Sequence, residues 1–170
     1  MSEADALQTR AGLVRLRPEG PQDAVFLKSL FAAHARAVLA HAGLPDAQVE
    51  QLVDMQHRGQ TLSYAARFPD ARRWIAELDG GPVARLIDNE EPGALYVVDI
   101  AVVPELHGRG IGSALIRATM RAAAERGLGV RALVTYGNQS SLAMFTRLGF
   151  KPTPQSTPAE LELSWRAGEA

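Results

Sequence analysis

Residues 95–112, LYVVDIAVVPELHGRGIG, decide the fold, because an apolar run passes through a short turn into a glycine-rich loop. Residues 95–103 are nearly continuous in β-branched side chains, which predicts a central strand covered on both faces. Asp99 is the charged residue that interrupts this run. Residues 113–126 then carry apolar side chains on one helical face before Gly127. The stretch therefore predicts a strand, a glycine loop and a helix in succession.

Periodic patterns on both sides of this unit predict further strands and helices. An Asp79-Gly80-Gly81 turn joins two of the strands into a hairpin. Residues before about Thr9 are expected to form a loose tail, and residues 89–93 a turn. The other strands are predicted at residues 14–18, 73–78, 82–88, 130–136 and 161–165, and the other helices at residues 21–43, 45–68 and 140–148.

Composition narrows the class of protein. The chain has 170 residues, 18 Lys and Arg against 19 Asp and Glu, and no Cys. This length indicates a single domain over residues 1–170, with a core of about 13–165. Without Cys there is no thiol nucleophile or disulfide. The near-zero net charge argues against nucleic acid as a partner, and no apolar stretch or leader predicts a membrane association, so we expect a cytoplasmic protein.

The glycine loop is a candidate anion site, because loop and first-turn N–H groups at a helix N-terminus favour negative charge. Gly108, Gly110 and Gly112 would let a ligand approach the backbone closely. The alternative is a tight turn with no ligand. A mononucleotide P-loop is excluded because the chain has no Gly-Lys pair. A dinucleotide loop is disfavoured, since Ser113 stands where the third glycine of that motif belongs.

Three segments in order resemble the GNAT superfamily of acyl-CoA-dependent N-acyltransferases. They are DIAVVPE (99–105), HGRGIG (107–112) and NQSSLAMFTRLGF (138–150). The resemblance implies a GNAT-like α/β fold with a central mixed sheet of six to seven strands flanked by about four helices. It also implies acetyl-CoA as acyl-donor substrate, with no metal.

The resemblance assigns cofactor contacts to the loop, to the backbone of the strand before it and to the helix after the next strand. His107 departs from the Gln or Arg usual at the first loop position, and Asn138 has the alternative role of a helix cap. The residues so assigned are Ile100, Ala101, Val102, His107, Gly108, Arg109, Gly110, Ile111, Gly112, Ser113, Asn138 and Phe145.

Catalysis in such enzymes is direct attack of an amine on the thioester in a ternary complex. Phe145 occupies the position of the family's usual tyrosine acid and has no proton to give. Asp99 is a candidate base or amine-orienting group, or else a structural hydrogen-bonding residue. The sequence thus predicts an N-acetyltransferase acting on a primary amine of a small molecule or protein. A non-catalytic or regulatory acyl-CoA-binding module is the alternative, and a homodimer is a reasonable expectation.

The acceptor side carries no motif. Gln56, Gln60 and Tyr64 are spaced i, i+4, i+8 and would share a helix face that could line a polar acceptor pocket. The alternative is a solvated face with the Tyr64 ring packed inward. His34, His41 and His57 lack metal-ligand spacing and are interpreted as surface or capping groups.

Overall fold

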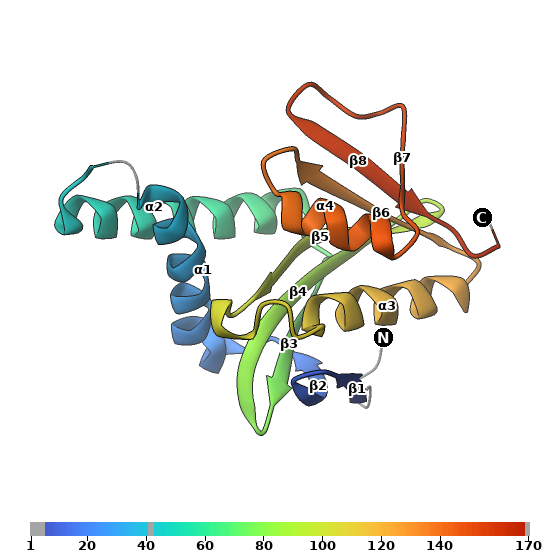
Figure 1. Cartoon of the computed structure of the whole chain (residues 1–170), viewed down its shortest axis with the longest axis horizontal. Helices are drawn as coiled ribbons and strands as arrows, with labels where there is room; N and C mark the ends of the chain where they lie inside the picture. Colours follow the sequence, from blue (N-terminus) through green and yellow to red (C-terminus); the bar gives the residue numbers. More distant parts are fainter. Residues whose placement is uncertain (1–5, 41–42, 169–170) are drawn as a thin grey trace.

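The computed structural model describes residues 6–40 and 43–168, which form eight strands and four α-helices (Figure 1). One mixed sheet has the strand order β1-β2-β3-β4-β5-β6-β8-β7. The strands are β1 (Ala6–Thr9), β2 (Gly12–Pro18), β3 (Arg72–Leu78), β4 (Gly81–Glu91), β5 (Ala94–Val102), β6 (Gly129–Thr135), β7 (Lys151–Pro152) and β8 (Glu160–Trp165). The helices are α1 (Ala24–Leu39), α2 (Asp46–Arg67), α3 (Ile111–Ala124) and α4 (Gln139–Arg147), with 3-10 turns η1 (Pro21–Asp23) and η2 (Pro104–Leu106).

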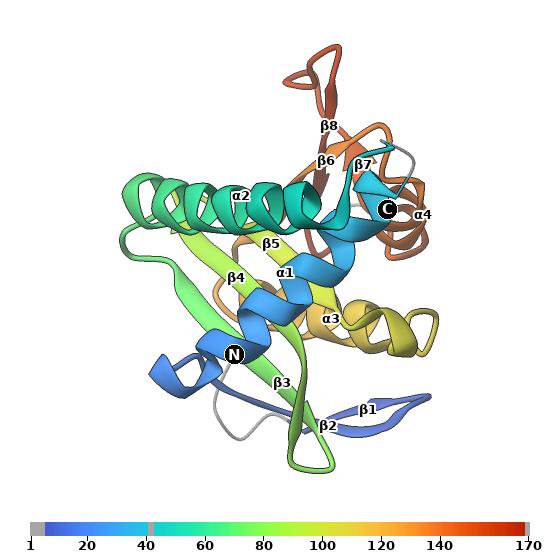
Figure 2. The same ribbon diagram turned by 90° about the vertical axis from the view of Figure 1, so that its left-hand side faces the viewer.

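The helices cover both faces of the sheet. Figure 2 shows α1 and α2 crossing in front of β4 and β5, with α3 on the far side. The buried face of α3 includes Ile111, Leu115 and Ile116, each at most 1% exposed, in one apolar cluster with residues of the sheet and of α4. None of the helices within the described residues has the length and apolarity needed to span a lipid bilayer.

The predicted α/β architecture is confirmed, with two more strands than the lower expectation. The prediction of a loose tail before Thr9 is wrong for residues 6–9. These residues form β1, which pairs antiparallel with β2, and Leu7 is only 5% exposed. The two-residue strand β7 pairs with β8. β4 also continues to Glu91, so the turn expected at residues 89–93 shrinks to its last two residues. These short or extended pairings depend on a neighbouring strand rather than on local periodicity.

The feature that shapes the site is a β-bulge in β5. Ile87 pairs with Asp99 and Asp88 with Val97, so Val98 is an extra residue without a partner on β4. The parallel pairing of β5 with β6 covers only four residue pairs and ends at Val97. A bulge bends and twists the strand that carries it. β5 therefore leaves β6 at the bulge, and among the described strands the residues after it pair with β4 alone.

An ion pair attaches the start of α1 to β2. Arg17 donates from both terminal nitrogens to the two carboxylate oxygens of Asp23, each at 2.7 Å, and the Gly20 N–H donates to the same carboxylate at 2.8 Å. The Asp23 side chain is 3% exposed. Hydrogen bonds from Arg17 hold the pKa of Asp23 below its usual value, although burial opposes this. The contact fixes where α1 leaves the sheet.

We expect Asp23→Asn to lower the free energy of unfolding by about 2 kcal/mol at neutral pH, because Arg17 loses the charged partner of two hydrogen bonds and keeps its ion pair with Glu77 at 2.7 Å. Since the native-state pKa is depressed, the carboxylate stabilises the fold above the unfolded value of about 3.9 and loses that effect as the pH falls through the native value. In urea unfolding, the difference in free energy of unfolding between wild type and variant should thus be constant above about pH 5 and become smaller below about pH 4. A gap that persists undiminished in acid would contradict the ion-pair assignment.

Candidate functional site

A cavity of about 420 Å³ lies beside β5 where that strand has left β6. We call it the loop cavity, because the glycine loop and the start of α3 form one wall and α4 forms another. Its lining includes most residues assigned from the sequence: Ile100, Ala101, Val102, His107, Gly108, Gly110, Ile111, Gly112, Ser113 and Asn138. The structure thus brings the three sequence segments together around one space. Arg109 and Phe145, also assigned from the sequence, are not among its lining residues.

Two residues of β5 present backbone groups to this cavity. The Val103 N–H donates to the Val83 carbonyl at 2.9 Å, and hydrogen-bonded pairs alternate along an antiparallel ladder. Ala101 therefore bonds toward β4, whereas the backbone groups of Ile100 and Val102 point to the edge that β6 has left. That edge can accept an extended ligand as an added strand.

The glycine loop forms the other wall through its backbone. Gly108 and Gly110 have φ of +72° and +87°, and Gly110 is the N-cap of α3. L-residues rarely adopt this left-handed conformation, so both positions favour glycine. At Gly112 the limit is space, since an added Cβ would lie 3.3 Å from the Met144 sulfur. The first-turn N–H groups of α3 remain directed toward the cavity, an arrangement that favours an anion.

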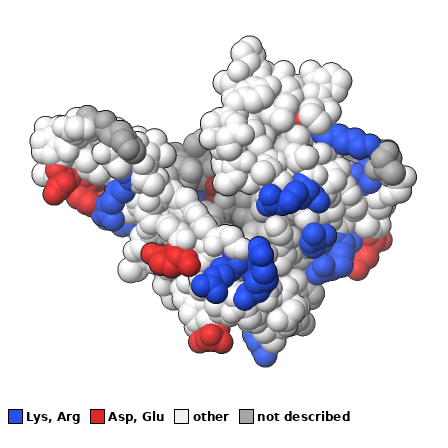
Figure 3. Space-filling view, in the orientation of Figure 1, with Lys and Arg blue, Asp and Glu red and all other residues white. Residues whose placement is uncertain are grey.

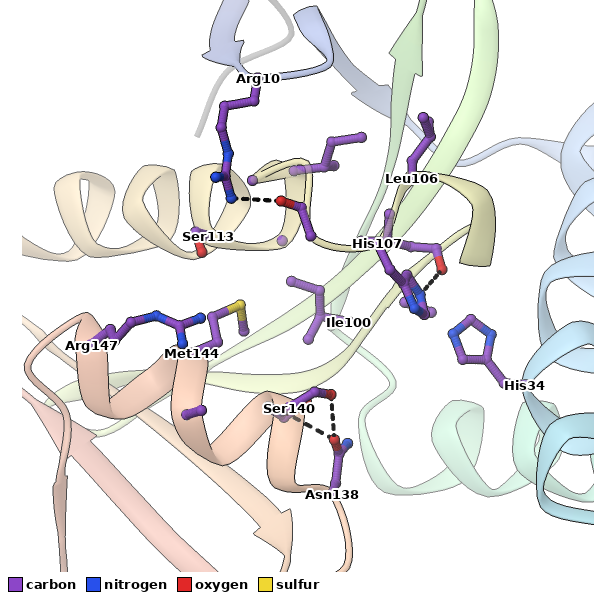
Figure 4. Close-up of a pocket in the computed structure, with 18 residues that line it drawn as sticks. Arg10, His34, Ile100, Leu106, His107, Ser113, Asn138, Ser140, Met144 and Arg147 are labelled. Atoms are coloured by element: carbon purple, nitrogen blue, oxygen red, sulfur yellow. Dashed lines mark hydrogen bonds between the residues drawn. The ribbon is translucent and has the colours of Figure 1, made fainter.

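Two arginines that no sequence motif indicated add positive charge where the glycine loop meets α3. Arg10, in the turn between β1 and β2, donates to the Gly108 carbonyl at 2.6 Å. Arg147, at the end of α4, lines the cavity from the opposite side. Figure 4 shows both side chains approaching Ser113. In Figure 3, Lys and Arg side chains also gather over the α3 side of the molecule.

Two histidines mark the other end of the loop cavity (Figure 4). The His107 ring donates through Nε2 to the Val102 carbonyl at 2.9 Å, and it lies 5.5 Å from the His34 ring. His34 lies within α1 and donates through Nδ1 to the Leu30 carbonyl at 2.8 Å. In the neutral ring this leaves Nε2 of His34 as a hydrogen-bond acceptor. The surface or capping role predicted for His34 is therefore incomplete, while His41 lies outside the described residues.

Asn138 and Phe145 hold α4 in place. The Asn138 side-chain oxygen accepts from the Ser141 N–H and the Ser140 hydroxyl, both at 3.1 Å, so it caps the helix while also lining the loop cavity. Phe145 is 2% exposed and packs edge-on against Phe150 with ring centroids 4.9 Å apart. The structure places this ring in the apolar core, which departs from the cofactor contact expected of it.

A second cavity of about 340 Å³, which we call the helix cavity, lies between α1, α2 and the strands β4 and β5. It shares His34, Ile100 and Ala101 with the loop cavity. Of the three candidates for an acceptor pocket, Gln56 and Gln60 line this cavity, whereas Tyr64 is not among its lining residues. The two cavities therefore meet at one short segment of β5.

Asp99 lies in the wall of the helix cavity as one half of an ion pair. Its Oδ2 accepts from two nitrogens of Arg85, at 2.7 and 3.0 Å, and Arg85 also donates to Gln60 at 3.3 Å. The Tyr64 hydroxyl lies 3.5 Å from Asp99 Oδ1. Burial, and then the charge of Asp99, raises the pKa of Tyr64 to about 12, so that phenol keeps its proton near neutral pH.

Comparisons with known proteins identify the family and the fold of the chain. A sequence model described as the "Acetyltransferase (GNAT) family" matches residues 40–150. A search of curated protein sequences finds no match. The chain is similar to the PaiA N-acetyltransferase of Thermoplasma acidophilum in complex with coenzyme A, with TM-score 0.70, 13% identity, and 90% of this chain and 98% of that chain covered.

Two further solved structures show the same fold. One is RimJ of Mycobacterium smegmatis in complex with CoA-disulfide, with TM-score 0.65, 20% identity, and coverage of 96% of this chain and 86% of that chain. The other is the ribosomal-protein-S18-alanine N-acetyltransferase of Escherichia coli, with TM-score 0.60, 15% identity, and 92% and 96% coverage.

Proposed function

The chain belongs to the GNAT family of acetyltransferases, and from that premise we propose that it transfers an acetyl group from acetyl-CoA to a primary amine by direct attack in a ternary complex. The observation that carries the proposal is the meeting of the two cavities at His34, Ile100 and Ala101. A donor in the loop cavity and an acceptor in the helix cavity would reach each other at this point.

The loop cavity suits coenzyme A from end to end. Its diphosphate would lie against the N–H groups of the glycine loop, between Arg10 and Arg147. The amide-bearing pantetheine arm would pair with the backbone groups of Ile100 and Val102 in the manner of an added strand. This orientation brings the thioester to the end of the cavity where His34 lies.

The chemistry then needs a neutral amine and a stabilised oxygen. An N–H on the open edge of β5 would polarise the thioester carbonyl, where negative charge develops. The amine nitrogen forms the C–N bond, the C–S bond breaks, and the thiolate leaves and is protonated by water. Phe145 supplies no proton, and a thiol pKa of about 8.5 makes the thiolate a tolerable leaving group without one.

Two side chains lie where they could handle the amine proton. We assign the proton to Nε2 of His34, because that nitrogen has a free lone pair and lies beside both cavities. Asp99 would orient the amine, since its carboxylate is already engaged by Arg85. This makes Asp99 the positioning group of the pair.

Turnover separates this proposal from the alternative of a non-catalytic or regulatory acyl-CoA-binding module, which the absence of an acid at Phe145 favours. The protein is mixed with acetyl-CoA and a panel of primary amines, and free thiol is measured. We expect thiol release that depends on the amine, with the N-acetylated product detected by mass spectrometry. Binding of acetyl-CoA with no release across the panel would support the binding module instead.

Removing one cation from the loop cavity should weaken coenzyme A binding. We expect Arg147→Gln to raise the Kd about 5-fold at low salt and less at high salt, because the lost contact is with phosphate and is partly screened. Titration calorimetry measures the change. Arg121→Gln, an exposed arginine on α3 that does not line the cavity, is the matched control and should leave the Kd unchanged. Equal effects of the two variants would contradict the diphosphate placement.

The proton assignment predicts a difference between two variants. His34→Gln should lower kcat about 10²-fold, the scale of general-base catalysis. Asp99→Asn should mainly raise the KM for the amine and change kcat much less. Steady-state kinetics give kcat and KM for both variants. If Asp99→Asn causes the large loss of kcat and His34→Gln mainly raises KM, the two roles are reversed.

A further inference from the structure

We propose that the helix cavity takes a primary amine carried on a short, uncharged apolar body. This inference deepens the proposed function and rests on it. It concerns the chemical class of the acceptor, which neither the family nor the similar structures determine for this chain.

One stripe of α1 supplies the apolar wall. Leu27, Phe31 and Val38 recur at spacings of four and seven residues, so they lie on the helix face that carries His34. Phe31 also packs against the His57 ring of α2, with centroids 5.3 Å apart, which connects the two helices above the cavity. The apolar residues of the lining on α1 are Leu27, Leu30, Phe31, Ala35, Val38 and Leu39.

The charges of the cavity exclude a polycation as the preferred occupant. Among the described lining residues Asp99 is the only carboxylate, and Arg85 neutralises it through two hydrogen bonds. A polyamine or an aminoglycoside would bring several ammonium groups to one carboxylate that is already paired, at a desolvation cost.

The polar groups of the helix cavity lie together at one end, where they suit a single amine. Asp99, Gln60 and the Nε2 of His34 are near the segment of β5 that faces the loop cavity, whereas the apolar stripe runs along α1. An occupant would direct its amine toward Ala101 and place its body against α1. The cavity volume of about 340 Å³ is near the lower end of ligand sites, which are roughly 300–1,000 Å³. The occupant is therefore small.

A series of straight-chain primary amines tests the proposal. With acetyl-CoA saturating, kcat/KM is measured by thiol release for n-propylamine, n-butylamine, n-pentylamine and n-hexylamine, and for spermidine. We expect kcat/KM to rise about 3- to 4-fold for each added methylene until the cavity is filled, which is the increment for burying a methylene. Spermidine should be a poorer substrate than n-hexylamine.

A flat or falling series, or a preference for spermidine, would overturn this proposal and leave the proposed function standing. Absence of thiol release with every amine would overturn both. The two failures are therefore distinguishable in one experiment.

A pair of matched variants on α1 tests whether the dependence of kcat/KM on amine length arises in the helix cavity. Ala35→Leu adds bulk inside the cavity and should lower kcat/KM for n-hexylamine about 10-fold, roughly the increment of two methylenes, with less than a 2-fold change for n-propylamine. Ala37→Leu makes the same change at an exposed position outside the lining and should alter neither rate. Coenzyme A affinity serves as the folding control, because Ala35 does not line the loop cavity. Equal losses for both amines in Ala35→Leu would overturn the proposed placement.

Discussion

The parting of β5 from β6 after Val97 is the constraint on which the rest of the site depends. Backbone N–H and C=O groups inside a protein need partners, and a strand that leaves its neighbour exposes a row of them. Here the bulge at Val98 turns the strand just where pairing ends. His107 already satisfies the Val102 carbonyl. The open groups that remain, those of Ile100 and the N–H of Val102, are what an amide-bearing ligand would complete.

The separation of β5 from β6 also places the charges of the site at its two ends. At one end the N-terminus of α3, Arg10 and Arg147 produce a positive potential without any excess of positive charge in the chain as a whole. At the other end lie the paired carboxylate Asp99 and the imidazole ring of His34. In the proposed function, a negatively charged donor would therefore bind with its reactive end beside α1. The helix cavity would then select the acceptor by shape and apolar contact more than by charge.

Local patterns in the sequence were sufficient to predict the strand, the loop and the helix that form the scaffold of the site. The β-branched run, the glycine loop and the helix after it were predicted from their own residues, because strand burial and helix periodicity are encoded locally. The glycine hairpin between β3 and β4 was predicted in the same way. Periodicity did not show β1, since four residues are too few to establish an alternation.

The missed site residues are those whose role depends on distant parts of the chain. Arg10 bonds to a carbonyl 98 residues away, and no local signal predicts that contact. His34 had a usable signal, since it lies on the same helical stripe as Leu27 and Phe31, and all three line the helix cavity. For Arg85 the sequence indicated only a charged residue within a strand, because its ion pair with Asp99 depends on how β4 and β5 pair. Phe145 was assigned by resemblance, and the core packing of its ring explains the departure.

Amide hydrogen exchange at Ile100 and Val102 reports whether coenzyme A pairs with the open edge of β5. Exchange of these two backbone N–H groups is followed by NMR with and without coenzyme A, and Ala101 serves as the internal reference because its N–H faces β4. We expect coenzyme A to slow exchange at Ile100 and Val102 and to leave exchange at Ala101 nearly unchanged. Unaltered exchange at both residues when the protein is saturated with coenzyme A would contradict the claim that the open edge of β5 binds the ligand as an added strand.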